Sequence, residues 1–379
     1  MNDNMKKILI LQLLGKSYGG IWQVNKLIGE EFIKNNYDVR ILSLRNNKVD
    51  FVSNYHKELK VDTINDIDEW DYPLKSDVLK FKISIIDYLK RLKNVKKDYH
   101  KMGEYISQYN PDYIIVSHYM LLEAIPKEYL KKTIYQQHSS AEYAFSQRGN
   151  KKTLFKYNNK ITILWLCKAS CDRGIKEGLN NCHYIYNAVR FNTDKIADVV
   201  KNKKLVTIAR LSYEKRIDLM IKIVNELFEN NNLLNDWTFE IYGSGDMEKE
   251  LKKLNYNKER IKLMGVTNNP EKVLLSSSIN LNTSLFEGFC LSILEANECG
   301  IPTVSFNFGE SVFEQILNGK TGIIASDLDN YKKELLDLMM DNDKLLSMSK
   351  ECKEFSKSFY SKSIINDWIK LFNNTIDKR

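Results

Sequence analysis

The residues with the clearest chemical potential lie in one stretch, SLFEGFCLSILEANECGIP, at 284–302. Its pattern predicts the end of a strand, a loop and then a helix. Gly288 permits close approach of the backbone to a ligand, and the backbone amides of Phe289, Cys290 and Leu291 fall at the start of the helix. Free amides at a helix N-terminus, aided by the helix dipole, form a site for an anion such as a diphosphate.

Two glutamates in the same stretch are spaced so that one precedes the helix and the other lies within it. Glu287 comes in the loop, and Glu295 shares a helix face with Leu291 and Leu294. The carboxylate of Glu295 should therefore be partly buried, and it needs hydrogen-bond donors. Paired hydroxyls of a ribose or a sugar would supply them. Two ordinary surface glutamates would give the same spacing, so the pair alone does not decide between these interpretations.

Two further segments place polar residues directly after predicted strands. In LVTIARLSYEKRIDLMIKI, Arg210 follows a buried strand and Lys215 precedes a helix. Both cations should therefore lie at the carboxyl edge of a sheet, where ligands bind in open α/β folds. In FEIYGSGDMEKEL, a Gly-x-Gly turn that begins at Gly243 follows the next strand. It is not a dinucleotide-binding fingerprint, because Glu248 stands where a third glycine is required.

These segments, in this order, resemble glycosyltransferase family 4, a large α-retaining group with the GT-B fold. Glu287-Gly-Phe…Glu295 is similar to the family's E-x7-E signature, and the resemblance is strongest from 205 to 325. It implies that Arg210 and Lys215 hold the pyrophosphate of a nucleotide sugar. It also implies that His138, at the end of the strand in IYQQHSS, lies beside the reacting sugar.

The same resemblance implies a full set of site residues. The predicted catalytic residues are His138 and Glu287, and the predicted donor-binding residues are Gly19, Gly20, Arg210, Lys215, Gly243, Val266, Thr267, Gly288, Phe289, Cys290, Leu291 and Glu295. The chain departs from the family pattern at Ala209 and Arg216, which replace common glycines, and at Cys290. The junction Tyr186-Asn187-Ala188-Val189 also lacks the usual Gly and Asp. The identity of the donor therefore does not follow from the resemblance.

Length and composition agree with a two-domain protein. A single core usually stops growing at roughly 250 to 300 residues, and this chain has 379. Its 57 basic and 49 acidic residues give a net charge of +8, which favours anionic partners. No apolar run approaches the roughly 20 residues that a membrane-spanning helix needs, so any membrane contact is expected to be peripheral. We expect no nucleic-acid binding, because the basic excess is concentrated in one segment without a recognisable motif.

Short apolar runs alternate with helical segments along the chain, as in parallel sheets covered by helices. Predicted strands of the first half lie near 8–14, 39–44, 113–117, 133–137, 161–166 and 183–186, and those of the second half near 205–209, 238–242, 261–264, 279–283, 302–306 and 322–325. The polar stretch 192–204 is the expected linker. The domains are accordingly predicted at 1–190 and 200–358, with a terminal helix at about 361–379 that can pack back on the first domain.

The segment 75–101 is unusually basic. It holds nine Lys or Arg residues against three Asp, and apolar residues recur at helical spacing between them. A basic amphipathic helix of this kind can lie on an anionic membrane. A solvated helix that covers the sheet is an equally good interpretation.

Neither a metal nor a cofactor is expected. The cluster of Cys167, Cys171, Cys182 and His183 lacks the tight Cys-x-x-Cys spacing of a zinc site. Three Asp-x-Asp patterns, at 66–68, 327–329 and 341–343, lie in polar turns or helix starts, where we interpret them as helix caps. The charge of a pyrophosphate would instead be neutralised by Arg210, Lys215 and helix amides.

The predicted fold is thus α/β, with two Rossmann-like, doubly wound domains facing each other across a cleft in the GT-B arrangement. The predicted function is retaining, metal-independent transfer of a hexose or N-acetylhexosamine from a nucleotide-diphosphate sugar, with UDP expected, to a cell-surface glycan, teichoic acid or lipid-linked acceptor. The expected location is the cytoplasm, peripheral to the inner membrane face. Two alternatives stay open: a nucleotide-sugar epimerase of the same fold, and a membrane-bound adaptor that has lost the chemistry.

Overall fold

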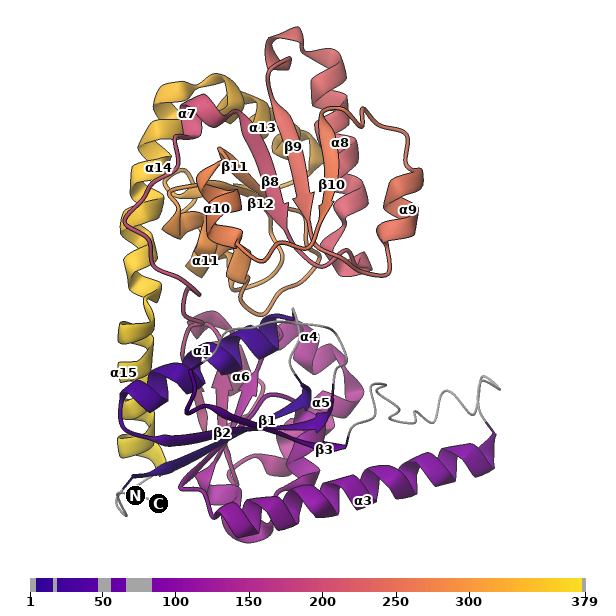
Figure 1. Cartoon of the computed structure of the whole chain (residues 1–379), viewed down its shortest axis with the longest axis vertical. Helices are drawn as coiled ribbons and strands as arrows, with labels where there is room; N and C mark the ends of the chain where they lie inside the picture. The colour runs from indigo at the N-terminus through magenta and orange to yellow at the C-terminus, as the bar shows by residue number, and fades with distance from the viewer. Residues whose placement is uncertain (1–4, 16–18, 47–55, 66–83, 377–379) are drawn as a thin grey trace. The chain divides into compact units, whose positions relative to one another are not determined.

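A computed structural model describes residues 5–15, 19–46, 56–65 and 84–376 of the chain. The chain forms two compact units. The first comprises Met1–Ile185 together with Ile364–Arg379, and the second comprises Tyr186–Ser363. The border therefore falls at Ile185, before the predicted end of the first domain at 190. Each unit is built around its own parallel sheet (Figure 1).

The first unit contains a seven-stranded parallel sheet in the order β3-β2-β1-β4-β5-β6-β7. Its strands are β1 (Lys7–Leu14), β2 (Asp38–Arg45), β3 (Lys60–Asn65), β4 (Tyr113–Val116), β5 (Thr133–Gln137), β6 (Thr162–Trp165) and β7 (Cys182–Tyr184). Strand order reverses between β1 and β4. Ligands bind at such a switch point in open α/β sheets, outside the carboxyl ends of the strands.

Helices of the first unit cover its sheet on both sides. They are α1 (Gly20–Lys34), α3 (Ile85–Tyr109), α4 (Ala141–Ser146), α5 (Arg148–Tyr157), α6 (Lys168–Lys176) and the terminal α15 (Ser361–Leu371), with short turns η1 (Tyr119–Ala124) and η2 (Lys127–Lys132). The C-terminal residues return to this unit through aromatic packing. The ring of Phe372 stacks on Tyr113 with centroids 4.0 Å apart, and Trp368 meets Phe32 edge-on at 5.8 Å.

The second unit contains a six-stranded parallel sheet in the order β10-β9-β8-β11-β12-β13. Its strands are β8 (Lys204–Ile208), β9 (Thr238–Tyr242), β10 (Ile261–Gly265), β11 (Ile279–Asn282), β12 (Thr303–Phe306) and β13 (Gly322–Ala325). The switch point lies between β8 and β11, which pair directly through Ile279 and Leu205. This is the position at which we look for a ligand site.

Helices of the second unit form two layers, one on each side of the sheet (Figure 1). One layer holds α8 (Ile217–Asn230) and α13 (Leu328–Met340), and the other holds α10 (Pro270–Leu275), α11 (Leu291–Glu298) and α14 (Asn342–Ser356). The shorter helices are α7 (Val199–Asn202), α9 (Glu248–Lys253) and α12 (Val312–Gln315). The larger apolar core of this unit includes the fully buried Leu205, Phe239 and Ile279, and a smaller cluster lies around Ile293 and Phe308.

The predicted doubly wound α/β fold is confirmed for both units. All twelve predicted strands are present, with ends that differ by at most a few residues. One strand was missed: β3 is an edge strand of six half-exposed residues in which only Val61 and Ile64 are apolar, so no strong alternation marks it. The predicted Asp caps are confirmed at Asp327, which caps α13, and at Asp341, which caps α14. The pattern at 66–68 lies outside the described residues.

Candidate functional site

Loops at one edge of the second sheet carry the predicted donor residues. Val266 and Thr267 follow β10, Gly243 follows β9, Arg210 follows β8, and the Glu287 loop follows β11. The strands β10, β9, β8 and β11 are neighbours in the sheet and all run parallel. Their carboxyl ends therefore lie side by side, and the structure brings these five predicted positions to a single edge around the switch point.

Gly243 allows three of these loops to pack closely. Its φ is +144°, and a Cβ added there would lie 1.8 Å from the carbonyl oxygen of Ala209. The amide of Gly243 donates to the Gly265 carbonyl at 2.8 Å, and the amide of Ala209 donates to the Tyr242 carbonyl at 2.9 Å. Any larger residue at 243 would push the loops after β8, β9 and β10 apart.

Lys215 and Glu287 form an ion pair between the loops after β8 and β11. Ser284 Oγ donates to Glu287 Oε1 at 2.8 Å, and Thr283 Oγ1 donates to the carbonyl of Lys215 at 2.9 Å. Burial disfavours charge on Lys215, but the Glu287 carboxylate outweighs that effect and raises the Lys215 pKa. The pair thus holds a permanent cation and a carboxylate side by side at the switch point, where they can meet a phosphate and a sugar hydroxyl.

Arg210 differs from Lys215 because it forms no close ion pair with a described carboxylate, although its charge interacts with that of Glu214. The residue is exposed, and among the described residues no carboxylate oxygen lies within 4.0 Å of its guanidinium. An exposed guanidinium that is not held in a close ion pair can bind an anionic ligand without first losing one.

The N-terminus of α11 differs from the sequence prediction at Cys290. The free backbone amide predicted there is not free, because it donates to Gln315 Oε1 at 2.9 Å, while Gln315 Nε2 donates to the Cys290 carbonyl at 2.8 Å. The first-turn amides of Leu291 and Ser292 remain, since no helical carbonyl precedes them. Burial raises the pKa of the Cys290 thiol to about 11, so this cysteine stays neutral.

Other parts of this loop serve packing. The ring of Phe289 is buried and stacks on Tyr186 with centroids 5.3 Å apart. The hydroxyl of Tyr186 donates to Glu314 Oε2 at 2.8 Å. Gly288 lies directly before this anchored ring. The buried side chain of Phe289 thus fixes the loop, and only the backbone of Phe289 could contact a ligand.

Glu295 receives its hydrogen bonds from a residue that the sequence did not single out. Its carboxylate is 1% exposed and forms a two-pronged ion pair with Arg190, whose Nη2 donates to Oε2 at 2.7 Å and whose Nε donates to Oε1. The predicted burial of Glu295 is therefore correct, but the donors are those of Arg190. Arg190 comes 105 residues earlier, and no spacing pattern links the two.

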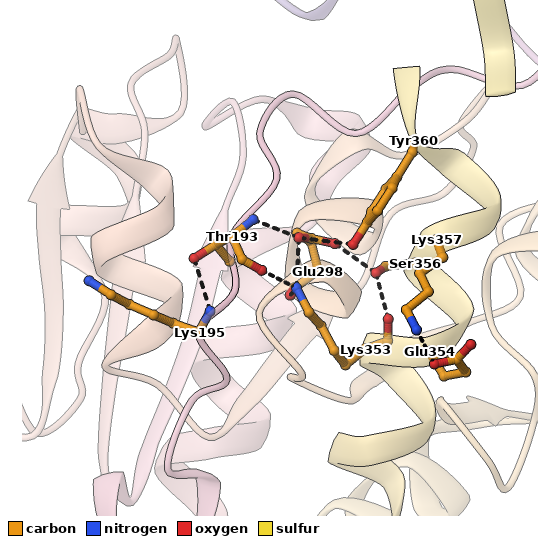
Figure 2. Close-up of polar contacts among 8 residues, drawn as sticks. All are labelled: Thr193, Lys195, Glu298, Lys353, Glu354, Ser356, Lys357 and Tyr360. Atoms are coloured by element: carbon orange, nitrogen blue, oxygen red, sulfur yellow. Dashed lines mark hydrogen bonds and ion pairs between the residues drawn. The ribbon is translucent and has the colours of Figure 1, made fainter. Parts of the chain in front are cut away.

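A second buried glutamate, Glu298, lies one turn further along α11. Figure 2 shows it surrounded by donors from two other segments. Its carboxylate accepts from the Thr193 amide at 2.8 Å, from Lys353 Nζ at 2.7 Å and from Ser356 Oγ at 2.7 Å. This network fastens the segment around Thr193 and helix α14 to the same helix that carries the candidate site.

The predicted residues of the first unit follow the carboxyl ends of β1 and β5, which lie on either side of β4 in the sheet. Gly19 caps α1, which starts at Gly20 after β1, and His138 follows β5. His118, which the sequence did not indicate, follows β4 between them. Burial lowers the pKa of His118 to about 4, and burial together with the charge of His118 lowers the pKa of His138 to about 4. Both imidazoles are therefore neutral at pH 7.

Tautomer and pairing distinguish these two histidines. His118 Nδ1 accepts from the Met120 amide at 3.3 Å, so its Nε2 carries the proton. His138 Nε2 is buried and has no hydrogen-bond partner among the described residues. A buried nitrogen without a partner is unusual, and it is a feature that functional sites tolerate.

The described part of the basic segment begins at Ser84, which caps α3. Ile85, Ile86 and Leu89 are 66%, 77% and 58% exposed, and the neighbouring Lys90 is also exposed. The cations Lys75, Lys80 and Lys82 lie outside the described residues. Helices long and apolar enough to cross a membrane are absent from the part of the chain that the structure describes. Within the same ranges, no three His, Cys, Asp or Glu side chains cluster as metal ligands would.

Comparison with known proteins bears on the second unit first. Residues 190–357 match the family model described as glycosyl transferases group 1, and they span nearly all of that unit. The chain is also similar over 96% of its length, at 26% identity, to an uncharacterized glycosyltransferase of Haemophilus influenzae, and the match spans 99% of that protein.

Two further similarities come from Staphylococcus aureus. The chain is 29% identical over 204 residues to a poly(ribitol-phosphate) alpha-N-acetylglucosaminyltransferase, a match that spans 52% of this chain and 39% of that protein. It resembles the crystal structure of a TarM mutant in complex with Fondaparinux, alpha-GlcNAc-glycerol and UDP, with a TM-score of 0.75, 16% identity and coverage of 98% and 100% of the two chains. The matched family and the relatives named here are glycosyltransferases, and the solved structure shares the GT-B fold; none of them favours an epimerase or an adaptor.

Proposed function

We propose that this glycosyltransferase takes a hexose or N-acetylhexosamine from a nucleotide-diphosphate sugar, with UDP as the nucleotide. The observation that carries the proposal is the set of loops at the switch point of the second sheet. Arg210, Lys215 and the first-turn amides of α11 offer positive charge and donors at one place. Val266 and Thr267 follow β10, the end strand of the sheet, at the same carboxyl edge. The cations and amides suit a diphosphate, and the loop after β10 suits the base of a nucleotide.

The chemistry follows from where charge develops. When the glycosidic bond breaks, negative charge grows on the leaving phosphate. Fixed cations and amides stabilise that charge more than they stabilise the bound substrate, so they lower the barrier. Glu287, held by Lys215 and Ser284, is proposed to orient a hydroxyl of the sugar. Because these cations supply the neutralising charge, the reaction is proposed to need no metal ion.

For the first unit we propose that His138 acts beside the reacting sugar, and that Gly19 and Gly20 let the start of α1 approach the donor phosphates. A neutral imidazole can donate or accept a hydrogen bond to a sugar hydroxyl. The reaction is proposed to proceed with retention, in which the acceptor hydroxyl attacks from the face that the nucleotide leaves. The S. aureus relative and the TarM complex, both named for alpha-GlcNAc groups, support an α-linked product.

We propose that the acceptor is a cell-surface glycan: a polyol-phosphate polymer such as a teichoic acid, or a lipid-linked glycan. The poly(ribitol-phosphate) transferase of S. aureus supports the first. The exposed apolar and basic side chains at the start of α3 support the proposal that the enzyme binds an anionic membrane from the cytoplasmic side.

The test is a donor screen with purified protein. UDP-, GDP- and ADP-sugars are each incubated with and without poly(ribitol phosphate), and release of nucleoside diphosphate is measured in buffer with EDTA. The proposal expects slow release from one UDP-sugar alone, faster release with the polymer, and an α-linked product by NMR. Conversion of the donor into its epimer without release of nucleotide would refute the transferase assignment.

A further inference from the structure

Left-handed backbone geometry marks one residue of the candidate site. Among the described residues, those other than glycine that have a positive φ are Asn36, Asn110, Asn159, Lys203 and Arg216. Asparagine adopts this conformation readily, but at a longer side chain it lowers the folded-to-unfolded ratio by a factor of about 5 to 30. Lys203 and Arg216, with φ of 47° and 49°, therefore require a compensating interaction or a function.

Lys203 has its interaction within the protein. Its Nζ forms an ion pair with Asp236, and its backbone carbonyl accepts from the amide of Thr238 at 3.1 Å. Thr238 is the first residue of β9, so these contacts fasten the start of β8 to the start of its neighbour. The protein itself therefore uses both the backbone and the charge of Lys203.

Arg216 has no such contact for its charge. Among the described residues, no carboxylate oxygen lies within 4.0 Å of its guanidinium. The residue is half-buried, yet its guanidinium nitrogens are not among the buried atoms that lack a partner, so they reach solvent. The strained backbone thus carries a cation that the described protein does not pair.

The backbone of Arg216 is fixed at the switch point of the second sheet. Thr283 Oγ1, which follows β11, donates to the carbonyls of both Lys215 and Arg216, each at 2.9 Å. The next residue, Ser284, donates to the Glu287 carboxylate at 2.8 Å. Arg216 therefore lies at the same edge as Lys215 and the loop that carries Glu287.

The charges already placed at this edge leave no excess for a diphosphate. Glu287 forms an ion pair with Lys215, and Glu214 is close enough for its charge to interact with those of Arg210 and Lys215. The two cations and the two carboxylates cancel. Both phosphates of a nucleotide sugar are ionised, and the phosphate that leaves gains a further negative charge. One more cation at this edge would make the group positive before the ligand binds.

We propose that Arg216 is a third cation for the diphosphate of the donor, kept in a strained conformation because its charge acts on the ligand. Its guanidinium binds a phosphate oxygen of the bound nucleotide. When the glycosidic bond breaks, the bonding electron pair passes to the leaving phosphate, and Arg216 stabilises the added charge. The inference rests on the proposed function, because it assumes that a diphosphate occupies this edge.

Arg216→Gly tests the inference, because it relieves the strain and removes the charge together. Its melting temperature should rise by about 2 °C, since the relief exceeds the entropy that glycine adds to the unfolded chain. Dissociation constants of UDP, GDP and ADP are measured by calorimetry, and the tightest binder is followed. Its dissociation constant should rise about tenfold, or about 1.4 kcal/mol.

Salt dependence shows whether the lost interaction is one of charge. The tenfold difference is expected at about 0.02 M NaCl, and it should fall below about threefold at about 0.5 M, where screening is strong. Arg216→Lys keeps both the charge and the strained backbone, so it should retain most of the affinity and the wild-type melting temperature. Arg216→Asn, which is neutral and tolerates a positive φ, answers the same question if Arg216→Gly does not fold.

The matched control is Lys203→Gly, which relieves the same backbone conformation at the other end of β8. Its ion pair with Asp236 is exposed, so the loss of that pair should change stability little. The affinity for the nucleotide should equal that of the wild-type chain at both salt concentrations.

The outcomes separate this inference from the proposed function. An unchanged affinity in Arg216→Gly, or a loss of the same size at both salt concentrations, would overturn the assignment of Arg216 to the diphosphate. A higher KM for poly(ribitol phosphate) with unchanged nucleotide affinity would assign Arg216 to the acceptor and would overturn it as well. These results leave the transferase proposal standing. Failure of all three nucleotides to bind the wild-type chain would count against the proposed function itself.

Discussion

Replacement of Arg210 by alanine should remove catalysis while leaving the fold unchanged. Arg210 is exposed and makes no ion pair with a described carboxylate, so its loss breaks no protein ion pair. Exposed substitutions of this kind change the free energy of unfolding by about 0.5 kcal/mol or less. The effect on the reaction is larger, because one fixed donor at a developing negative charge contributes a factor of about 100 to 1,000 in kcat.

Solvent at an exposed cation screens its charge, so we expect the lower end of that range. Arg210→Ala should reduce kcat for the active donor about 100-fold, which corresponds to about 2.7 kcal/mol in the barrier. The assay is release of nucleoside diphosphate under saturating donor and acceptor, with unfolding by urea measured on the same preparations. Arg210→Lys should recover part of the rate, because a point charge replaces the two-pronged donor.

The matched control is Lys222→Ala, which removes an exposed cation from α8 without touching the sheet edge. It should leave kcat unchanged. A kcat for Arg210→Ala within about twofold of the wild-type value would refute the assignment of Arg210 to the leaving group. If Lys222→Ala and Arg210→Ala instead lowered kcat by the same large factor, the rate would depend on net charge and not on the position of Arg210.

The same geometry supports three other tests. Gly243→Ala should lower the free energy of unfolding in urea by about 3 kcal/mol or more, because its Cβ would lie 1.8 Å from the Ala209 carbonyl oxygen. Gly319→Ala, with φ +79° and open space around it, should lower it by only about 1 to 2 kcal/mol, and equal losses would refute the close-packing explanation. Glu287→Gln should lower kcat at least about tenfold and leave the dissociation constant of the free nucleoside diphosphate nearly unchanged; a weakening of nucleotide binding alone would assign Glu287 to the nucleotide. The pKa values of His118 and His138 are about 4 in the folded state and about 6.5 in the unfolded state, so the unfolded state binds more protons between pH 6.5 and 4. The free energy of unfolding should therefore fall as the pH falls through that window, by up to about 3 kcal/mol for each histidine. His138→Asn should flatten this slope if the burial is as described.

Much of the fold could be predicted because its signals are local. Buried parallel strands are short apolar runs, and twelve of them stood out between helical segments. The β3 strand did not, because an edge strand of half-exposed polar residues has no apolar pattern to detect. Loops at strand ends were also predictable, since chain order alone places Arg210, Gly243 and Glu287 after β8, β9 and β11.

Long-range partners were not predictable. Arg190 meets Glu295 and Gln315 meets Cys290 across 105 and 25 residues, and both contacts depend on how loops fold over α11. The sequence could show that Glu295 would be buried and would need donors, but the choice between a ligand and a protein cation required coordinates. His118 is a similar case, since a single histidine after a strand becomes notable only when β5 brings His138 beside it.

The central claim is that the edge of the second sheet binds a nucleoside diphosphate through fixed cations and helix amides. A crystal structure of the whole chain with UDP, or with whichever nucleotide binds most tightly, tests it most directly. The claim predicts diphosphate oxygens within about 3.2 Å of Arg210, Lys215 or the amides of Leu291 and Ser292. A nucleotide bound away from the carboxyl ends of β8 and β11, with these groups making no contact to it, would contradict the claim.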